Sequence, residues 1–98
     1  MSQYMIDINL PASPEEEFFT LIPKQRAVIN ELMSEGTITS YTLSVERTKL
    51  WVLVNAESEG EVMDILYRFP MLKFMRFKIH ELMFHQMVAF RFPSISLN

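Results

Sequence analysis

Polar and apolar residues alternate with a period of two in four segments of the chain, which predicts four strands that each bury one face. The segments cover about residues 4–10, 41–45, 50–54 and 74–85. Pro11 ends the first segment, and the polar stretch at residues 46–49 is short enough to join the second and third as a hairpin. The pattern therefore predicts an isolated strand, a hairpin and a final strand.

Apolar residues at helical spacing predict two helices between these strands. In the first helix, Ser13 is the candidate N-cap before three glutamates, and Gly36 is the expected end. Pro23 removes a backbone donor within this helix, so we expect a kink or a restart there. The second helix begins at a capping box formed by Ser58 and Glu61 and runs to the proline before the last strand.

The resulting order, β-α-β-β-α-β, is that of the ferredoxin-like fold. This is an α+β arrangement in which a four-stranded antiparallel sheet carries two helices on one face. Right-handed crossovers place the first and third strands at the centre and the last strand beside the first. The side chains expected to pack against the helices are Tyr4, Ile6, Ile8, Leu43, Val45, Val52, Val54, Phe77 and Ile79.

The other face of the sheet mixes polar and apolar side chains. Its expected members are Met5, Asp7, Asn9, Ser40, Thr42, Ser44, Trp51, Leu53, Arg76, Lys78 and His80. An apolar patch of a kind that soluble monomers avoid would form there from Trp51, Leu53, Met5, Leu82 and Phe84. We therefore predict that the same face of a second copy covers it, giving a dimer with a partly polar cavity between two sheets.

The end of the chain is also apolar. We expect one domain over residues 1–87 and a C-terminal extension over residues 88–98. Burying a large apolar side chain is worth roughly 1.5–3 kcal/mol, and a lone small domain has little surface left to receive the extension. The extension is therefore predicted to pack on a partner subunit, with packing over its own sheet as the alternative.

Composition limits the class of protein. The 98 residues, 49% of them hydrophobic and 21% charged, fit one globular domain. The absence of cysteine excludes disulfides and fits a reducing compartment. No signal-like N-terminus or membrane-length apolar run occurs, so we expect a cytoplasmic protein without a membrane partner. The net charge is −3, yet residues 71–98 hold one acid and four bases and are the candidate for attracting an anion.

Several short motifs occur at the spacing that they have in a known family. They are Leu10-Pro11, Leu32 followed by Glu35-Gly36, Phe69-Pro70-Met71-Leu72 with Met75, and His85. Over about residues 4–85 the chain thereby resembles the muconolactone isomerase family, small ferredoxin-like proteins that form dimers and larger rings. It departs from the family at Tyr41-Thr42-Leu43, at Glu46 in the hairpin and at Gln86. The resemblance implies a homo-oligomer that binds a small anionic lactone or carboxylate between subunits.

Isomerisation in such a family moves a proton within an unsaturated lactone that carries a carboxylate. The reaction needs a base beside the carbonyl, a charge that stabilises the enolate and a cation for the carboxylate. The candidates are Asp7 and His80 for proton transfer, and Arg76, Lys78, Trp51 and Thr42 for binding the ligand. The alternative is a non-catalytic ligand-binding or structural protein of the same fold, in which these residues only pair charges across strands.

Other classes of site are disfavoured. His80 and His85 are five residues apart and point to opposite faces of a straight strand, so no metal site is expected. No glycine-rich phosphate loop occurs, and no cofactor is expected. RNA-binding modules share this strand order, but the chain is acidic and Lys49-Leu50-Trp51-Val52 lacks their paired aromatics, so no nucleic-acid partner is expected.

Overall fold

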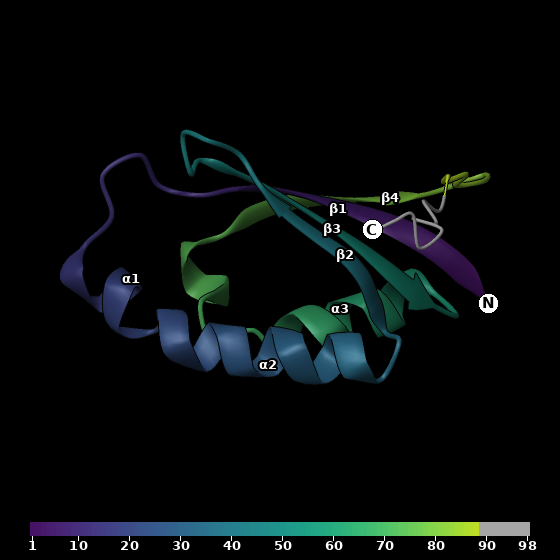
Figure 1. Cartoon of the computed structure of the whole chain (residues 1–98), viewed down its shortest axis with the longest axis horizontal. Helices are drawn as coiled ribbons and strands as arrows, with labels where there is room; N and C mark the ends of the chain where they lie inside the picture. Colours follow the sequence, from purple (N-terminus) through teal and green to yellow (C-terminus); the bar gives the residue numbers. More distant parts are fainter. Residues whose placement is uncertain (89–98) are drawn as a thin grey trace, which may run out of the picture.

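A computed structural model describes residues 1–88 and contains all four predicted strands and both predicted helical regions (Figure 1). In chain order the elements are β1 (Ser2–Asn9), α1 (Glu16–Thr20), α2 (Ile22–Ser34), β2 (Ile38–Leu43), β3 (Lys49–Ala56), α3 (Glu59–Tyr67), the 3₁₀ helix η1 (Leu72–Phe74) and β4 (Arg76–Glu81). This order confirms the predicted α+β fold.

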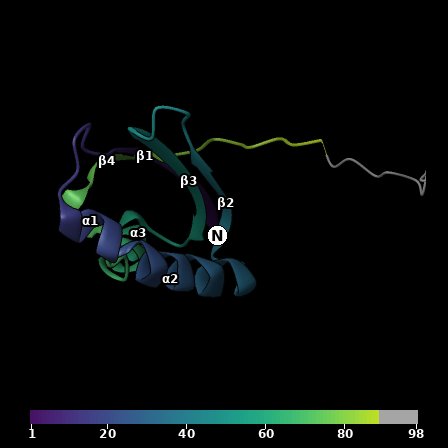
Figure 2. The same cartoon turned by 60° about the vertical axis from the view of Figure 1, so that its left-hand side comes forward.

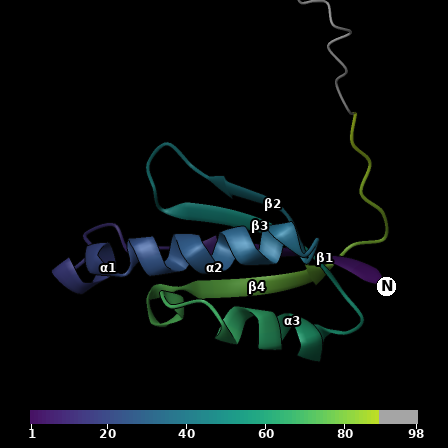
Figure 3. The same ribbon diagram turned by 60° about the horizontal axis from the view of Figure 1, so that its bottom comes forward.

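The four strands form one antiparallel sheet in the order β2-β3-β1-β4. The first and third strands are therefore central and the last lies beside the first, as the two crossovers predict. The long helices α2 and α3 both lie on one face of the sheet, and none of the helices within residues 1–88 covers the other (Figures 1 and 3). We call the uncovered side the open face.

The hydrophobic core lies between the sheet and the helices. Its fully enclosed side chains include Ile6, Ile8, Leu32, Ile38, Val52, Val54, Val62 and Leu66. Two residues predicted for the core are outside it, because Leu43 is 51% exposed and Val45 is 93% exposed. A register irregularity between Ile38 and Ser40 brings Ile38 into the core instead. Leu43 is the last residue of β2, and Val45 lies in the turn that follows.

The predicted break in the first helical region is confirmed. Pro23 occupies the first turn of α2, where its missing donor costs least, and Leu21 separates the two helices. The predicted cap at Ser13 is wrong, because α1 begins at Glu16 without a side-chain cap. At α3 the cap is confirmed, since Ser58 Oγ accepts a hydrogen bond from the Glu61 amide at 3.2 Å.

The last strand is shorter than its pattern predicts. It ends at Glu81, after which the Leu82 amide still donates to the Gln3 carbonyl at 2.9 Å. Residues 82–88, which we call the arm, then run away from the domain (Figure 2). Four of the arm's side chains are large, apolar and exposed: Met83, Phe84, Met87 and Val88. Beyond Val88, the predicted C-terminal extension lies outside the described residues.

Candidate functional site

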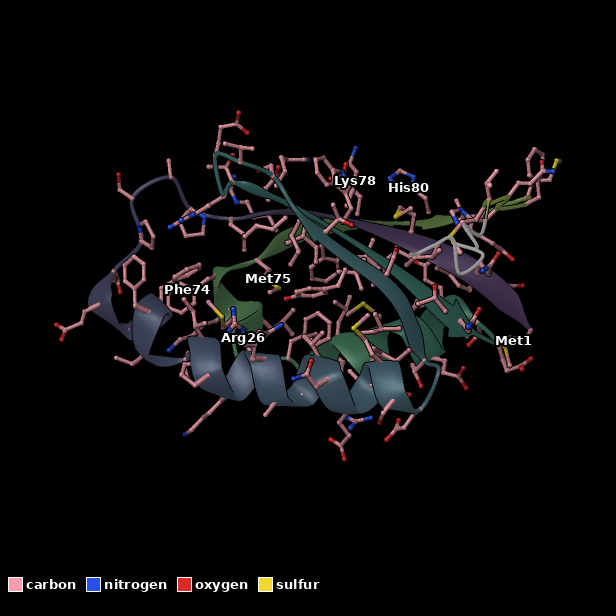
Figure 4. All side chains as sticks on the ribbon, in the orientation of Figure 1. Met1, Arg26, Phe74, Met75, Lys78 and His80 are labelled. Atoms are coloured by element: carbon pink, nitrogen blue, oxygen red, sulfur yellow. The ribbon has the colours of Figure 1, made fainter. Side chains whose placement is uncertain are left out.

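Strand register brings four of the six predicted site residues into one row across the open face. Asp7 on β1 pairs with Trp51 on β3 and with Lys78 on β4, and Trp51 pairs in turn with Thr42 on β2. Side chains opposite one another in adjacent strands lie about 4.5–5.5 Å apart at Cβ, so these residues are true neighbours. Lys78 and His80 project from the sheet away from the helices (Figure 4).

The other two predicted residues lie one row to either side. His80 pairs with Met5, which pairs with Leu53. Arg76 pairs with Asn9, which pairs with Lys49. The predicted residues therefore share one face, although His80 and Arg76 flank the central row instead of belonging to it.

The nearest charged partner of Asp7 is Lys49, which the sequence assigned to the hairpin turn. Lys49 Nζ lies 2.6 Å from Asp7 Oδ1 and donates to Asn9 Oδ1 at 3.0 Å. Asp7 Oδ1 is shielded from solvent, and the Lys49 contact, although short, lacks hydrogen-bond geometry. The carboxylate is thus compensated by charge, with Lys78 as its other cationic neighbour across the sheet.

The open face exposes less apolar surface than its pattern predicts. Leu53 is only 2% exposed, although it faces away from the helices and is not part of the core cluster. Met5 and Trp51 are half-buried by their neighbours in the sheet. The open face is therefore mainly a polar and cationic surface around a small apolar centre.

A cavity of about 560 Å³ lies on the helix side, at the end of the sheet where α1 and the β2–β3 turn approach each other. We call it the end cavity. Its apolar wall includes Leu10, Phe18, Phe19, Ile22, Leu43, Leu50, Met71 and Met75. Figure 4 shows Phe74 and Met75 between the sheet and the helices at this end. The volume is within the range of pockets that hold small organic ligands.

A buried polar network forms the inner wall of the end cavity. Gln25 on α2 is only 5% exposed, and its Oε1 accepts a hydrogen bond from the Met71 amide at 3.1 Å. Its Nε2 donates to the Tyr41 hydroxyl at 3.3 Å. Burial raises the pKa of Tyr41 above its usual value, and the hydrogen bond from Gln25 partly opposes this shift. The hydroxyl therefore stays protonated and can donate into the cavity.

Three charged side chains also line the end cavity: Arg26 on α2, and Glu46 and Arg47 from the β2–β3 turn. Among residues 1–88, neither arginine belongs to an ion pair. Arg47 has a φ of 66°, a left-handed conformation that is uncommon for a residue with a side chain. Two arginines without a carboxylate partner thus border an apolar cavity.

Sequence reasoning missed both Lys49 and the lining of the end cavity. The sequence placed Lys49 in the hairpin turn, whereas it is the first residue of β3; extending the alternation of Trp51 and Leu53 back by one step would have placed it on the open face. For the cavity, the available signal was Gln25, a polar residue at a core-facing position of the first helix. Arg26 and Arg47 carried no such signal, because both are ordinary surface residues by pattern.

A metal-binding cluster and a membrane-spanning helix were both sought in the described part of the chain. Within residues 1–88, no group of three or more His, Asp or Glu side chains is placed to hold a metal ion. In the same part of the chain, no helix has the length and hydropathy that crossing a membrane requires.

Comparison with known proteins identifies the family. The sequence profile described as muconolactone delta-isomerase matches residues 3–87. Among curated proteins, none matches the chain. The matched span runs from β1 to the arm and includes both the open face and the end cavity. The chain therefore belongs to the muconolactone delta-isomerase family.

Proposed function

We infer that this protein binds a small unsaturated lactone or carboxylate, and that the end cavity is the binding site. Two arginines beside an apolar cavity of about 560 Å³ carry this proposal: Arg26 and Arg47, neither of which forms an ion pair within residues 1–88. The carboxylate of the ligand would neutralise the charge of the arginines, and the apolar wall of the cavity would contact the ring of the ligand. Membership of the family supports a ligand of this class.

The end cavity contains some of the groups that lactone isomerisation needs. The protonated Tyr41 hydroxyl and the Gln25 amide would donate to a carbonyl or enolate oxygen. The one carboxylate in the described lining is Glu46, which would have to move the proton. An unmutated protein that binds the ligand and does not turn it over would be a binding protein without catalysis, which is the alternative function.

A second candidate site for proton transfer is the open face. Its support is the row in which Asp7, paired with Lys49 at 2.6 Å, lies between Trp51 and Lys78, with His80 one row away. An anion placed between Lys78 and Arg76 would bring a ligand proton near Asp7 or His80. Because this surface is open, such a site would require a second subunit against it, as in the predicted homodimer.

The two sites can be separated with the single tryptophan of the chain. Trp51 lies on the open face, whereas Leu50, the neighbouring residue, lines the end cavity. Muconolactone would be titrated into the protein while heat and Trp51 fluorescence are recorded together. We expect binding heat with little change in fluorescence, and a loss of affinity of about 10-fold or more when Arg26→Ala removes a charge-assisted contact.

The matched control is Lys78→Ala, which removes a cation from the open face and should leave the affinity unchanged. Strong quenching of Trp51, with affinity lost in Lys78→Ala and kept in Arg26→Ala, would assign the ligand to the open face instead. Turnover of muconolactone by Asp7→Ala, His80→Ala and Glu46→Gln then tests each candidate for proton transfer. Full activity in the first two variants would remove Asp7 and His80 from the mechanism.

A further inference from the structure

Gln25 is a polar side chain that lies among the core residues of α2. Ile29 and Leu32 are the other buried residues of that helix, and the three share one face at helical spacing. Burying an amide costs free energy unless both of its ends form hydrogen bonds. Gln25 has partners from two distant parts of the chain, the Met71 amide and the Tyr41 hydroxyl. These partners determine which end of the amide points in which direction.

The Met71 amide fixes the orientation of the Gln25 side chain. A backbone N–H only donates, so it must face the carbonyl oxygen of Gln25, and Met71 N lies 3.1 Å from Oε1. Met71 is itself buried, so exchanging the two ends of the Gln25 amide would set two donors against each other away from solvent. The Gln25 Nε2 group therefore points to Tyr41, where it can only donate.

The orientation of Gln25 in turn fixes the role of the Tyr41 hydroxyl. Gln25 Nε2 donates to the hydroxyl oxygen at 3.3 Å, so the oxygen acts as an acceptor and its hydrogen stays available. Within residues 1–88, the Tyr41 hydroxyl forms no other hydrogen bond. Burial raises the pKa of Tyr41, so the hydroxyl keeps this hydrogen at neutral pH. Both side chains line the end cavity, whose inner wall thus presents a directed donor.

We propose that Tyr41 selects the ligand by donating to an oxygen of its ring, and that Gln25 is the positioning residue that fixes this direction. The place of the ligand in the end cavity is taken from the proposed function, on which this inference rests. With the carboxylate of the ligand at Arg26 or Arg47, a lactone carbonyl at the inner wall would accept the Tyr41 hydrogen. A ring without an acceptor would leave this half-buried donor unpaired.

This selection acts on the ring of the ligand and not on its carboxylate. Arg26 and Arg47 can pair with any small carboxylate, so they cannot distinguish a lactone from a carbocyclic acid of the same shape. A site that holds a hydrogen-bonding group for its ligand rejects analogues without the matching group more strongly than an apolar pocket rejects a change in size. Tyr41 is therefore the specificity-determining residue of the cavity.

Two ligands that share the carboxylate separate the role of Tyr41 from that of the arginines. Muconolactone has the lactone carbonyl, whereas cyclopentenylacetate keeps the unsaturated five-membered ring and the carboxymethyl group and has no ring acceptor. Calorimetry gives the affinity of the full-length protein for each. In Tyr41→Phe, we expect the ratio of the two affinities to shift by about 10-fold or more toward cyclopentenylacetate, because only muconolactone loses a hydrogen bond.

The matched control is Tyr67→Phe, which removes the same hydroxyl group from α3. Tyr67 is 69% exposed and does not line the end cavity. The ratio of the two affinities should equal that of the unmutated protein.

Gln25→Glu tests the direction of the hydrogen bonds. A carboxylate still accepts from the Met71 amide, but it can only accept, so it takes the Tyr41 hydrogen away from the ligand. The Met71 amide and the two arginines of the cavity favour the ionised form of the introduced carboxyl, and measuring at about pH 8 favours it further. Its repulsion of the ligand carboxylate affects both ligands alike and cancels in the ratio. The ratio should therefore shift as it does in Tyr41→Phe, with the circular dichroism of the folded protein retained.

Each result supports or overturns a stated part of the inference. An unchanged ratio in Tyr41→Phe would overturn the selection by Tyr41, and an unchanged ratio in Gln25→Glu would overturn the positioning role of Gln25. If muconolactone affinity depends on Arg26 while the ratio stays constant, the proposed function stands and the selection falls. If the ratio shifts in Tyr41→Phe although Arg26→Ala has no effect, the selection stands and the arginine leaves the site. If neither ligand binds, both fall.

Discussion

The open face and the end cavity lie on opposite sides of the same sheet, and they are built in different ways. On β3 the two regions are represented by adjacent residues, because Trp51 belongs to the open face and Leu50 to the cavity wall. The open face is a regular grid in which alternate residues of four strands meet in register. The end cavity is assembled from two helices, a loop, a turn and the ends of strands.

This difference determines how charge is compensated in each region. On the open face, Asp7 has a lysine on each side, and Lys49 contacts both Asp7 and Asn9. At the cavity mouth, Arg26 and Arg47 have no carboxylate partner among the described residues. A regular sheet surface compensates its charges through cross-strand neighbours, whereas an irregular rim leaves charge available for a ligand.

The largest expected difference in unfolding free energy between the two regions comes from substituting Gln25. Gln25→Leu should lower the free energy of unfolding by about 2–3 kcal/mol, because it leaves the buried Met71 amide without an acceptor. Asp7→Asn on the open face should cost less than about 1 kcal/mol, because its partner Lys49 is partly exposed. Urea denaturation of both variants measures the difference. Equal losses would show that the polar network of the cavity is no more important for stability than the ion pair of the open face.

Trp51 tests whether the open face is an interface. If a second copy covers this face, Trp51→Ala should weaken the dimer about 10- to 30-fold, as loss of an interface aromatic commonly does. Sedimentation velocity over a range of concentrations measures the dissociation constant. The variant should keep nearly normal unfolding stability, because Trp51 is only half-buried in the single chain. A wild-type protein that is monomeric at micromolar concentration would contradict the predicted homo-oligomer itself.

Tyr41 gives the stability of the end cavity a dependence on alkaline pH. Its folded pKa is raised above the ordinary value near 10, so its contribution to stability is complete below about pH 10 and is lost as the pH rises through the folded pKa. Tyr41→Phe should cost about 0.5–1 kcal/mol at neutral pH, through the hydrogen bond with Gln25, and should flatten the loss above pH 10.

The measurement for Tyr41 is the unfolding free energy from pH 8 to 11 for both proteins. Tyr4 also has a raised pKa, through burial first and then through carboxylates such as Glu81. Because Tyr4 is present in both proteins, the difference between the two curves isolates Tyr41. Parallel curves would rule out a buried, protonated hydroxyl at the cavity wall.

Arg47 should produce a small gain in stability together with a loss of ligand affinity. Arg47→Gly relieves a φ of 66° and should stabilise the fold by about 0.5–1 kcal/mol. The same change removes a cation from the cavity mouth and should weaken muconolactone binding about 3- to 10-fold. Thermal unfolding and calorimetry of one preparation measure both effects. A gain in stability with unchanged affinity would exclude Arg47 from the ligand site.

The sheet was predictable because alternation and element order are properties of the sequence itself. The same alternation assigned Asp7, Trp51 and Lys78 to one face, and the crossover rule made β1 and β4 neighbours, so the central row of the open face could be predicted. The prediction that Leu43 and Val45 are buried was wrong, because the register irregularity in β2 and the end of that strand depend on tertiary packing. The end cavity could not be predicted, since its lining comes from segments with no common period.

The short helix α1 has a consequence for how the end cavity admits a ligand. α1 contains no buried residue, and it is held mainly by the edge-on contact of Phe18 with Phe74 and by the ion pair of Glu17 with Lys73. The break at Leu21 separates it from the core residues of α2. A movement of α1 therefore disrupts few contacts, and amide hydrogens there should exchange well before those of α2. Entry to the cavity then requires a local opening of one wall, and the rest of the domain can stay folded around the incoming molecule.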